Sequence, residues 1–167
     1  MWTNISNEGS GLSWVIKSMT NGTAVWVTDG SYMKEISPTI SGDGWILLCT
    51  QSGFRLCRSF VEYTSSAGLY RGELLGILAI HTLCAALKDY YSLTSATGVI
   101  CCNNQGALFK SKQTRRRIPT GASQADIKRS LRNVKAKTVT SISYKWVKSH
   151  MDCHKHWNHL SKKQQVN

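Results

Sequence analysis

Residues 69–87, LYRGELLGILAIHTLCAAL, form the longest helical pattern in the chain. They join the strands predicted before them to the strands predicted after them. Apolar side chains recur here every three or four residues without an intervening proline, which predicts an amphipathic helix over residues 66–91. Glu73 falls one turn before Ile77, at the edge of the apolar stripe. A carboxylate placed there costs free energy unless it is paired or binds a metal ion. The helix therefore carries both a core face and a candidate functional residue.

Three apolar and β-branched runs before this helix predict strands. They are residues 23–28 (TAVWVT), 44–50 (GWILLCT) and 54–60 (FRLCRSF). The short connection QSG at residues 51–53 is typical of a hairpin loop. We therefore expect an antiparallel meander of three strands.

Two further strands are predicted after the helix. Residues 99–102 (VICC) are apolar, and the order strand, helix, strand makes them parallel to the first strand by the right-handed crossover rule. Residues 141–147 (SISYKWV) alternate, which favours a strand with Trp146 in the core. The sequence thus predicts an α/β fold with a five-stranded mixed sheet flanked by helices.

The remaining segments are shorter or more polar. Helical patterns cover residues 104–110 and 124–137, and a basic loop at residues 111–122 separates them. Residues 1–22 are rich in Gly, Ser and Asn, which predicts a leader or linker, although Trp14, Val15 and Ile16 could dock on the domain. With 167 residues and 41% apolar content, we expect a single domain over residues 23–167.

We expect an intracellular protein of the cytoplasm or nucleus with no membrane partner. The most apolar segment contains Arg71, Glu73 and His81, which a bilayer penalises. Residues 1–20 lack the basic start, apolar run and cleavage site of a signal peptide. The six cysteines form no C-x-x-C pair and are typical of buried thiols in a reducing compartment.

The net charge of +12 is concentrated in the last third of the chain. Residues 1–109 contain six basic and seven acidic residues, whereas residues 110–167 contain fifteen basic and two acidic ones. A one-sided field of this strength favours a polyanionic partner, and nucleic acid is the commonest polyanion. The alternative is a solvated basic surface that serves solubility.

Three polar positions are expected to converge on one spot. Asp29 ends the first strand, Glu73 lies near the start of the long helix, and Asn103 ends the fourth strand. Two carboxylates and a third ligand arranged in this way suit divalent metal ions that act on a phosphodiester. The third position, however, carries a neutral amide. Taken singly, Asp29 could be a turn residue and Glu73 a charge on the helix surface.

Five strings in this chain resemble a ribonuclease H domain, of the type found in retrotransposon reverse transcriptases. They are TDGS (28–31), GDGWILL (42–48), YRGELLGILAIH (70–81), VICCNNQGAL (99–108) and YKWVKSH (144–150). The resemblance implies the ribonuclease H fold and hydrolysis of the RNA strand of an RNA–DNA hybrid with two Mg²⁺ or Mn²⁺ ions. It also implies a reverse transcriptase domain on the same parent polyprotein.

Carried over by this resemblance, Asp29 would bridge both metal ions and Glu73 would bind one of them. Asn103 stands in the place of the third acid, and His150 matches a loop histidine thought to assist product release. The fourth acid would open a last helix, and no such segment is found up to Asn167. The resemblance therefore implies a domain without its C-terminal helix, weak metal binding and an inactive or strongly impaired enzyme.

Another acidic residue could replace a missing carboxylate of this site only if it lay near Asp29 and Glu73. The sequence places Asp43 in a meander turn and Asp89 at the far end of the helix, and leaves Asp152, two residues after His150, as the remaining candidate. Two other functions stay open: a non-catalytic module that binds hybrids or duplexes, and an unrelated basic structural protein.

The basic residues of the last third are the candidate nucleic-acid contacts. Helical spacing lets Lys128, Arg129 and Arg132 share a face beside the basic loop, where they could follow phosphates. The predicted contacts are Lys112, Arg115, Arg116, Arg117, Lys128, Arg129 and Arg132.

A cluster of potential zinc ligands lies further on, within a single short loop. Its members are His150, Cys153, His154, His156 and His159. Structural zinc sites usually combine two separated ligand pairs, so a flexible basic loop is the alternative interpretation.

Overall fold

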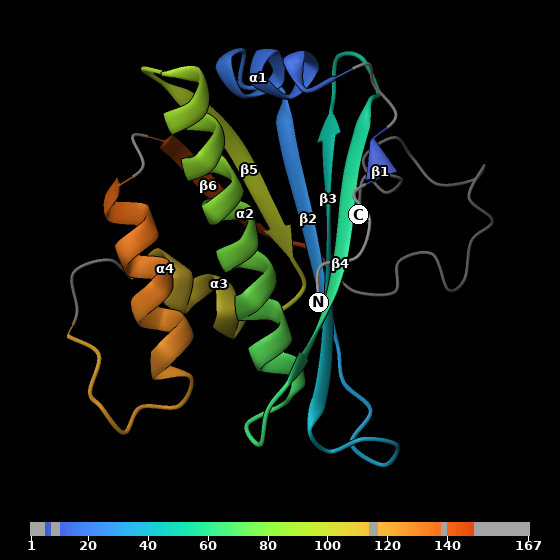
Figure 1. The fold of residues 1–167 in the computed structure, drawn as a ribbon, viewed down its shortest axis with the longest axis vertical. Helices are drawn as coiled ribbons and strands as arrows, with labels where there is room; N and C mark the ends of the chain where they lie inside the picture. Colours follow the sequence, from blue (N-terminus) through green and yellow to red (C-terminus); the bar gives the residue numbers. More distant parts are fainter. Residues whose placement is uncertain (1–5, 8–10, 114–116, 138–139, 149–167) are drawn as a thin grey trace.

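The computed structural model describes residues 6–7, 11–113, 117–137 and 140–148, which form a mixed β-sheet with helices packed on it (Figure 1). The strands are β1 (Ser6–Asn7), β2 (Ala24–Ser31), β3 (Ile40–Cys49), β4 (Arg55–Tyr63), β5 (Ala96–Cys102) and β6 (Thr140–Trp146). Their order in the sheet is β1-β4-β3-β2-β5-β6. Strands β2, β3 and β4 form an antiparallel meander, and β5 and β6 run parallel to β2. The predicted five-stranded mixed sheet is thus confirmed in β2–β6.

Strand β1 is a sixth, two-residue strand that the sequence did not predict. Ser6 and Asn7 pair with Cys57 and Leu56 at the outer edge of β4. An edge strand offers unpaired backbone groups, so a short segment can join it without a strand pattern of its own.

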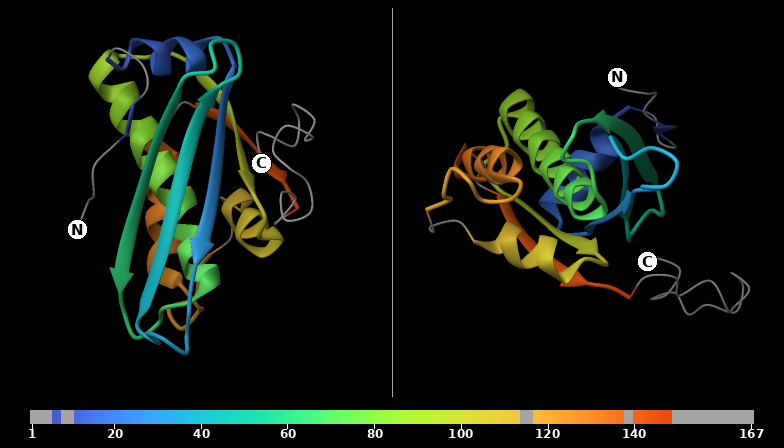
Figure 2. Two further views of the ribbon diagram at one scale, coloured as in Figure 1. Left: turned by 90° about the vertical axis from the view of Figure 1, so that its right-hand side faces the viewer. Right: turned by 90° about the horizontal axis from the view of Figure 1, so that it is seen from below.

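Three of the described helices follow the meander in the chain. Helix α2 (Leu69–Tyr91) crosses the middle of one face, α4 (Ala125–Lys137) packs beside it, and α3 (Gln105–Lys112) follows β5 (Figures 1 and 2). Ile77, Ile80 and Cys84 of α2 are fully buried against the sheet, as the apolar stripe predicted. The helix ends at Ser92, which adopts a left-handed conformation and donates its N–H to Lys88 O.

Helix α1 (Ser13–Thr20) lies within the range expected to be a leader or linker. It packs at the end of the sheet near the start of β2 (Figure 1). Trp14, Val15 and Met19 are buried in the main core, and two of these are residues that the sequence indicated could dock. Because the helix has only eight residues, its pattern is too short to stand out from the polar residues around it.

Helix α2 approaches the meander very closely through two glycines. A Cβ on Gly72 would lie 2.8 Å from Gly42 O, and one on Gly76 would overlap Thr28 Oγ1 and Asp43 Oδ2. The helix can therefore rest on the backbone of β2 and β3 only because these positions lack side chains. This contact sets the depth at which Glu73, between the two glycines, enters the fold.

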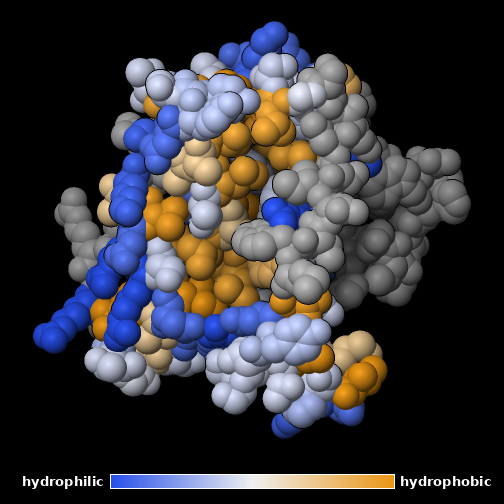
Figure 3. Space-filling model, in the orientation of Figure 1, coloured by the Kyte–Doolittle hydropathy of each residue, from blue (hydrophilic) through white to orange (hydrophobic). Residues whose placement is uncertain are grey.

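By length and composition alone, α2 could cross a membrane, since its most apolar window has a mean hydropathy of 1.2. Half of that window, however, is buried inside the domain. Arg71 and Glu73 also bond to other elements of the fold. Figure 3 shows apolar side chains gathered beside α2, where Phe60, Leu75 and Leu78 line a groove next to β4. The buried half of the window and the bonds of Arg71 and Glu73 are typical of a core helix in a folded domain.

Candidate active site

Asp29 and Asn103 meet at one edge of the sheet. Thr28 of β2 is in register with Cys102 of the parallel strand β5, so the residues that follow each of them are neighbours. Nδ2 of Asn103 donates a 2.9 Å hydrogen bond to Oδ1 of Asp29. Asp29 is exposed and Asn103 is half-buried, so the pair faces solvent.

Glu73 lies beneath this pair, inside the fold. Its side chain is only 1% exposed, and Sγ of Cys102 donates to its Oε2 at 3.2 Å. A Cβ on Gly30 would lie 2.9 Å from Glu73 N, which shows how closely α2 approaches the end of β2. Burial raises the pKa of Glu73, and the nearby charge of Asp29 adds to the effect. The structure thus brings Asp29, Glu73 and Asn103 together, with one carboxylate outside and one inside.

Asp43 is a fourth member of this region that the sequence misplaced. The Gly-Asp-Gly string suggested a turn, but β3 begins at Ile40, so Asp43 lies within the strand, opposite Gly30. It is 5% exposed, and Thr28 Oγ1 donates to its Oδ1 at 3.1 Å. Burial raises the pKa of Asp43 from 3.8 to about 9, and the charge of Glu73 adds to the rise. Alternation with the buried Trp45, two residues on, was the signal that could have found it.

Trp146 also differs from expectation. It was predicted to be a core residue but is 47% exposed, and its Nε1 donates a 2.9 Å hydrogen bond to Asn103 O. Because it is the last residue of the edge strand β6, the fold covers only part of its ring. The indole thus holds the backbone of Asn103 while one side of the ring stays open beside the site.

The described residues do not supply the carboxylates that two divalent ions need. Asp29 offers an exposed carboxylate, and Glu73 offers Oε1, which has no hydrogen-bond partner among the described residues. Asn103 could add only a neutral oxygen, whereas two ions would bring four positive charges to two carboxylates. In the described part of the chain, no group of three or more Asp, Glu, His or Cys side chains could hold a metal ion. The described donors are therefore one exposed carboxylate, one buried carboxyl group and one amide.

An ion-pair network fixes helix α4 to the rest of the domain. Arg71 of α2 is 6% exposed and donates to Glu62 of β4 at 2.6 Å and to Asp126 of α4 at 2.8 Å. It also donates to Gln124 Oε1. Hydrogen bonding to Arg71 lowers the pKa of Asp126, which keeps that carboxylate charged. One buried guanidinium therefore orients the N-terminal end of the basic helix.

The predicted nucleic-acid contacts fall into three groups. Arg117, Lys128 and Arg132 line a pocket between α3 and α4. Lys112 is exposed outside it, and Arg129 reaches back to Pro119 O at 3.5 Å. Arg115 and Arg116 lie outside the described residues, as do His150, Asp152 and the potential zinc ligands up to His159.

No protein-family model and no curated protein matches the sequence. Solved structures, in contrast, resemble the fold. Ribonuclease H1 from the archaeon Halobacterium salinarum has 15% sequence identity and a TM-score of 0.53, with 75% of this chain and 86% of that chain covered. The protease–reverse transcriptase of prototype foamy virus has 15% identity and a TM-score of 0.57, with 87% of this chain and 19% of that chain covered.

A third similar structure is a ribonuclease H1 isolated from compost, solved in complex with an RNA/DNA hybrid. It has 12% identity and a TM-score of 0.50, with 75% of this chain and 86% of that chain covered. At such low identity the shared feature is the arrangement of strands and helices, and it agrees with the strand order of β2–β6 and the position of α2. The chain therefore has the ribonuclease H fold.

Proposed function

We propose that this chain is a ribonuclease H-type domain that binds RNA–DNA hybrids and has lost most of its capacity to hydrolyse the RNA strand. The observation that carries the proposal is the pair Asp29–Asn103, joined at 2.9 Å where two parallel strands end above the buried Glu73. Asn103, the position at which the resemblance implies a third acid, carries an amide instead.

The loss of activity follows from charge. An intact site of this kind holds two Mg²⁺ or Mn²⁺ ions, which activate water and stabilise the leaving oxygen. Here Asp29 and Glu73 supply at most two negative charges. Burial raises the pKa of Glu73, which reduces the negative charge that Glu73 contributes. The amide of Asn103 occupies Oδ1 of Asp29, an oxygen that would otherwise be available to an ion. Weak binding of one ion is the expected state.

The direct test is cleavage of a labelled RNA–DNA hybrid in Mg²⁺ or Mn²⁺ by the wild type and by Asn103→Asp. We expect the variant to cleave about 10²-fold faster or more, because a misplaced catalytic group typically costs that much. The double variant Asp29→Asn/Asn103→Asp should lose the gain. If Asn103→Asp cleaves no faster than wild type, the enzyme proposal is wrong for this chain.

The second candidate is a non-catalytic module for RNA–DNA hybrids or duplexes. It is favoured by the basic residues of α3, the segment 117–122 and α4, which line a pocket of their own, and by the ion pair through which Arg71 holds α4 at Asp126. Binding of a hybrid in the presence of a metal chelator, unaltered by Asp29→Asn, supports this candidate if Asn103→Asp does not cleave. Binding that requires a metal ion contradicts it.

The wider setting belongs to the same proposal. The foamy virus protein with a similar fold contains a reverse transcriptase, and we propose that the parent polyprotein of this domain contains one as well. An intracellular location is supported by the five described cysteines, which are all free thiols.

A further inference from the structure

A basic pocket lies between α3, the segment 117–122 and α4, away from the acidic site. Its volume is about 300 Å³. Its lining residues are Lys110, Ser111, Gln113, Arg117, Ile118, Pro119, Ala122, Lys128, Leu131, Arg132 and Lys135. Five of these carry positive charge, and among the described residues that line the pocket none is acidic.

The positive charges are held close together by the fold. Lys128 donates to Ser123 O, and its Nζ lies 5.4 Å from the centre of the Tyr70 ring. Lys135 donates to Ser111 O, and its Nζ lies 5.0 Å from the centre of the Tyr144 ring. Burial lowers the pKa of both lysines, and the charge of Lys110 lowers that of Lys128 further. An anion beside Lys110 and Lys128 would relieve the repulsion between these two lysines.

A buried hydroxyl points to hydrogen bonding as well as charge. Ser111 is 1% exposed, lines the pocket, and its Oγ has no hydrogen-bond partner among the residues that the structure describes. Leaving a buried hydroxyl unpaired costs free energy, which a bound acceptor oxygen would recover. Ile118, Pro119 and Leu131 provide an apolar wall against which a sugar could pack.

From these features we propose that the pocket binds one phosphate group, held by Lys110, Arg117, Lys128 and Arg132 with Ser111 as a hydrogen-bond donor. A phosphate combines negative charge with several acceptor oxygens, which matches converging cations and a hydroxyl. The source is either a nucleic-acid strand or a small phosphorylated molecule. Only the first source rests on the proposed function.

The pocket differs from the basic surface expected from the sequence. Lys112 and Arg129 were expected to contribute but do not line it, whereas Ser111, which the sequence did not indicate, does. The eight-residue helix α3 spans about 12 Å, since an α-helix rises 1.5 Å per residue, and it separates the pocket from Asn103. A strand lying along α3 could therefore reach the pocket and the acidic site at once.

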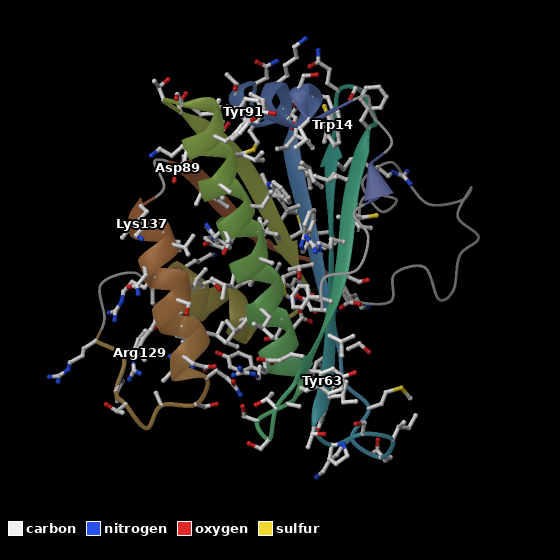
Figure 4. All side chains as sticks on the ribbon, viewed as in Figure 1. Trp14, Tyr63, Asp89, Tyr91, Arg129 and Lys137 are labelled. Atoms are coloured by element: carbon white, nitrogen blue, oxygen red, sulfur yellow. The ribbon has the colours of Figure 1, made fainter. Side chains whose placement is uncertain are left out.

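The test measures the affinity of the whole chain for inorganic phosphate at low ionic strength, by calorimetry and by amide NMR shifts. Lys128→Gln and Arg117→Gln should each weaken phosphate binding about tenfold or more, since a charge-assisted hydrogen bond contributes that much. Ser111→Ala should weaken it severalfold without lowering the melting temperature, because it removes a hydroxyl that has no partner. Lys137→Gln is the control, because it removes one charge at the opposite end of α4 from Arg129 (Figure 4).

No saturable phosphate binding by the wild type, or equal weakening by Lys137→Gln and Lys128→Gln, overturns the pocket. Competition between phosphate and an RNA–DNA hybrid, with both weakened by Arg117→Gln, identifies a strand phosphate as the ligand. Phosphate binding that the hybrid does not displace identifies a small phosphorylated molecule. Failure of Asn103→Asp to cleave leaves these results unaffected, so the two proposals fail separately.

Discussion

At the scale of single residues, the candidate site has its carboxylates in the wrong places for strong metal binding. Asp29 is exposed but shares an oxygen with Asn103, while Glu73 and Asp43 are buried and have raised pKa values. Asp43, whose pKa burial raises to about 9, brings no negative charge to the site at neutral pH. The site therefore holds less charge at neutral pH than its three carboxyl groups suggest.

The raised pKa of Asp43 predicts a specific dependence of stability on pH. In the folded state it keeps its proton up to about pH 9, whereas in the unfolded state it ionises above 3.8. Its protonated form therefore stabilises the fold fully below pH 3.8, and this stabilisation is lost as the pH rises toward 9. One proton corresponds to a slope of about 1.4 kcal/mol per pH unit. In Asp43→Asn, which keeps an oxygen for Thr28, this part of the slope should vanish.

Urea unfolding at pH 5, 7 and 8.5 measures the difference between Asp43→Asn and wild type. We expect the variant to gain stability relative to wild type as the pH rises. Asp89→Asn, at the exposed end of α2 (Figure 4), makes the same chemical change at the surface and serves as control. Parallel pH profiles for Asp43→Asn and wild type would contradict the prediction.

Asn103→Asp should couple the stability of the fold to divalent metal ions. Without metal, a second carboxylate beside Asp29 replaces a hydrogen bond with repulsion. We therefore expect the free energy of unfolding to fall by about 1–2 kcal/mol. With Mg²⁺ or Mn²⁺ present, binding to the folded state should restore the melting temperature. Melting curves with and without metal measure both effects. Asn133→Asp, on the exposed part of α4, adds the same charge elsewhere, and an equal metal response in the two variants would count against the site.

At the scale of elements, the contact of α2 with the meander determines the site. Gly72 and Gly76 let the helix rest on β2 and β3, and this depth buries both Glu73 and Asp43. A helix held further out would leave room for water around these carboxyls and lower their pKa values. The buried acids are thus a consequence of helix packing.

Gly76→Ala should destabilise the fold by about 2–3 kcal/mol or more. The added methyl group would overlap Thr28 Oγ1 and Asp43 Oδ2, and overpacking of this kind outweighs the gain in helix propensity of about 1 kcal/mol. Gly68→Ala, where a Cβ meets nothing within 4 Å, is the control and should cost only about 1 kcal/mol, the preference of an N-cap for Gly over Ala. Urea unfolding of both variants is the measurement. A Gly76→Ala variant as stable as wild type would mean that α2 can shift outward freely.

The sequence predicted the elements that have strong periodicity and missed those that depend on tertiary contacts. The meander, α2 and the parallel strand β5 follow from apolar patterns, and their order placed Asp29 and Asn103 at one edge. Helix α1 and strand β1 were not predicted, because they are short and are stabilised by packing on the sheet. Asp43 was assigned to a turn because its flanking glycines resemble one, although they serve the close approach of α2 and the pairing of β3. The exposure of Trp146 depends on its place at the end of an edge strand, which alternation does not reveal.

At the scale of the whole molecule, acidic and basic functions are separated in space as they are in sequence. Residues 110–167 carry fifteen of the 21 basic residues, and the described part of this segment forms the pocket at α3 and α4. Helix α1, with Lys17, lies at the opposite end of the sheet from Asp29 (Figure 1). A polyanion should therefore be oriented toward one side of the domain before it makes any contact with the site.

This separation predicts which charges determine the salt dependence of hybrid binding. Each phosphate that a basic side chain neutralises releases counterions, so log K against log salt should fall steeply, with a slope near −0.9 per contact for duplex DNA. Arg117→Gln and Arg132→Gln should each make the slope less negative by about 0.9, which is the value of one phosphate contact. Lys17→Gln removes the same net charge from the other end of the sheet and should leave the slope unchanged. Fluorescence anisotropy of a labelled hybrid between 50 and 200 mM salt is a suitable measurement, over roughly the range in which such contacts change affinity most. A flat slope for the wild type excludes phosphate contacts, and an equal change in all three variants shows that net charge, not the α3–α4 surface, attracts the hybrid.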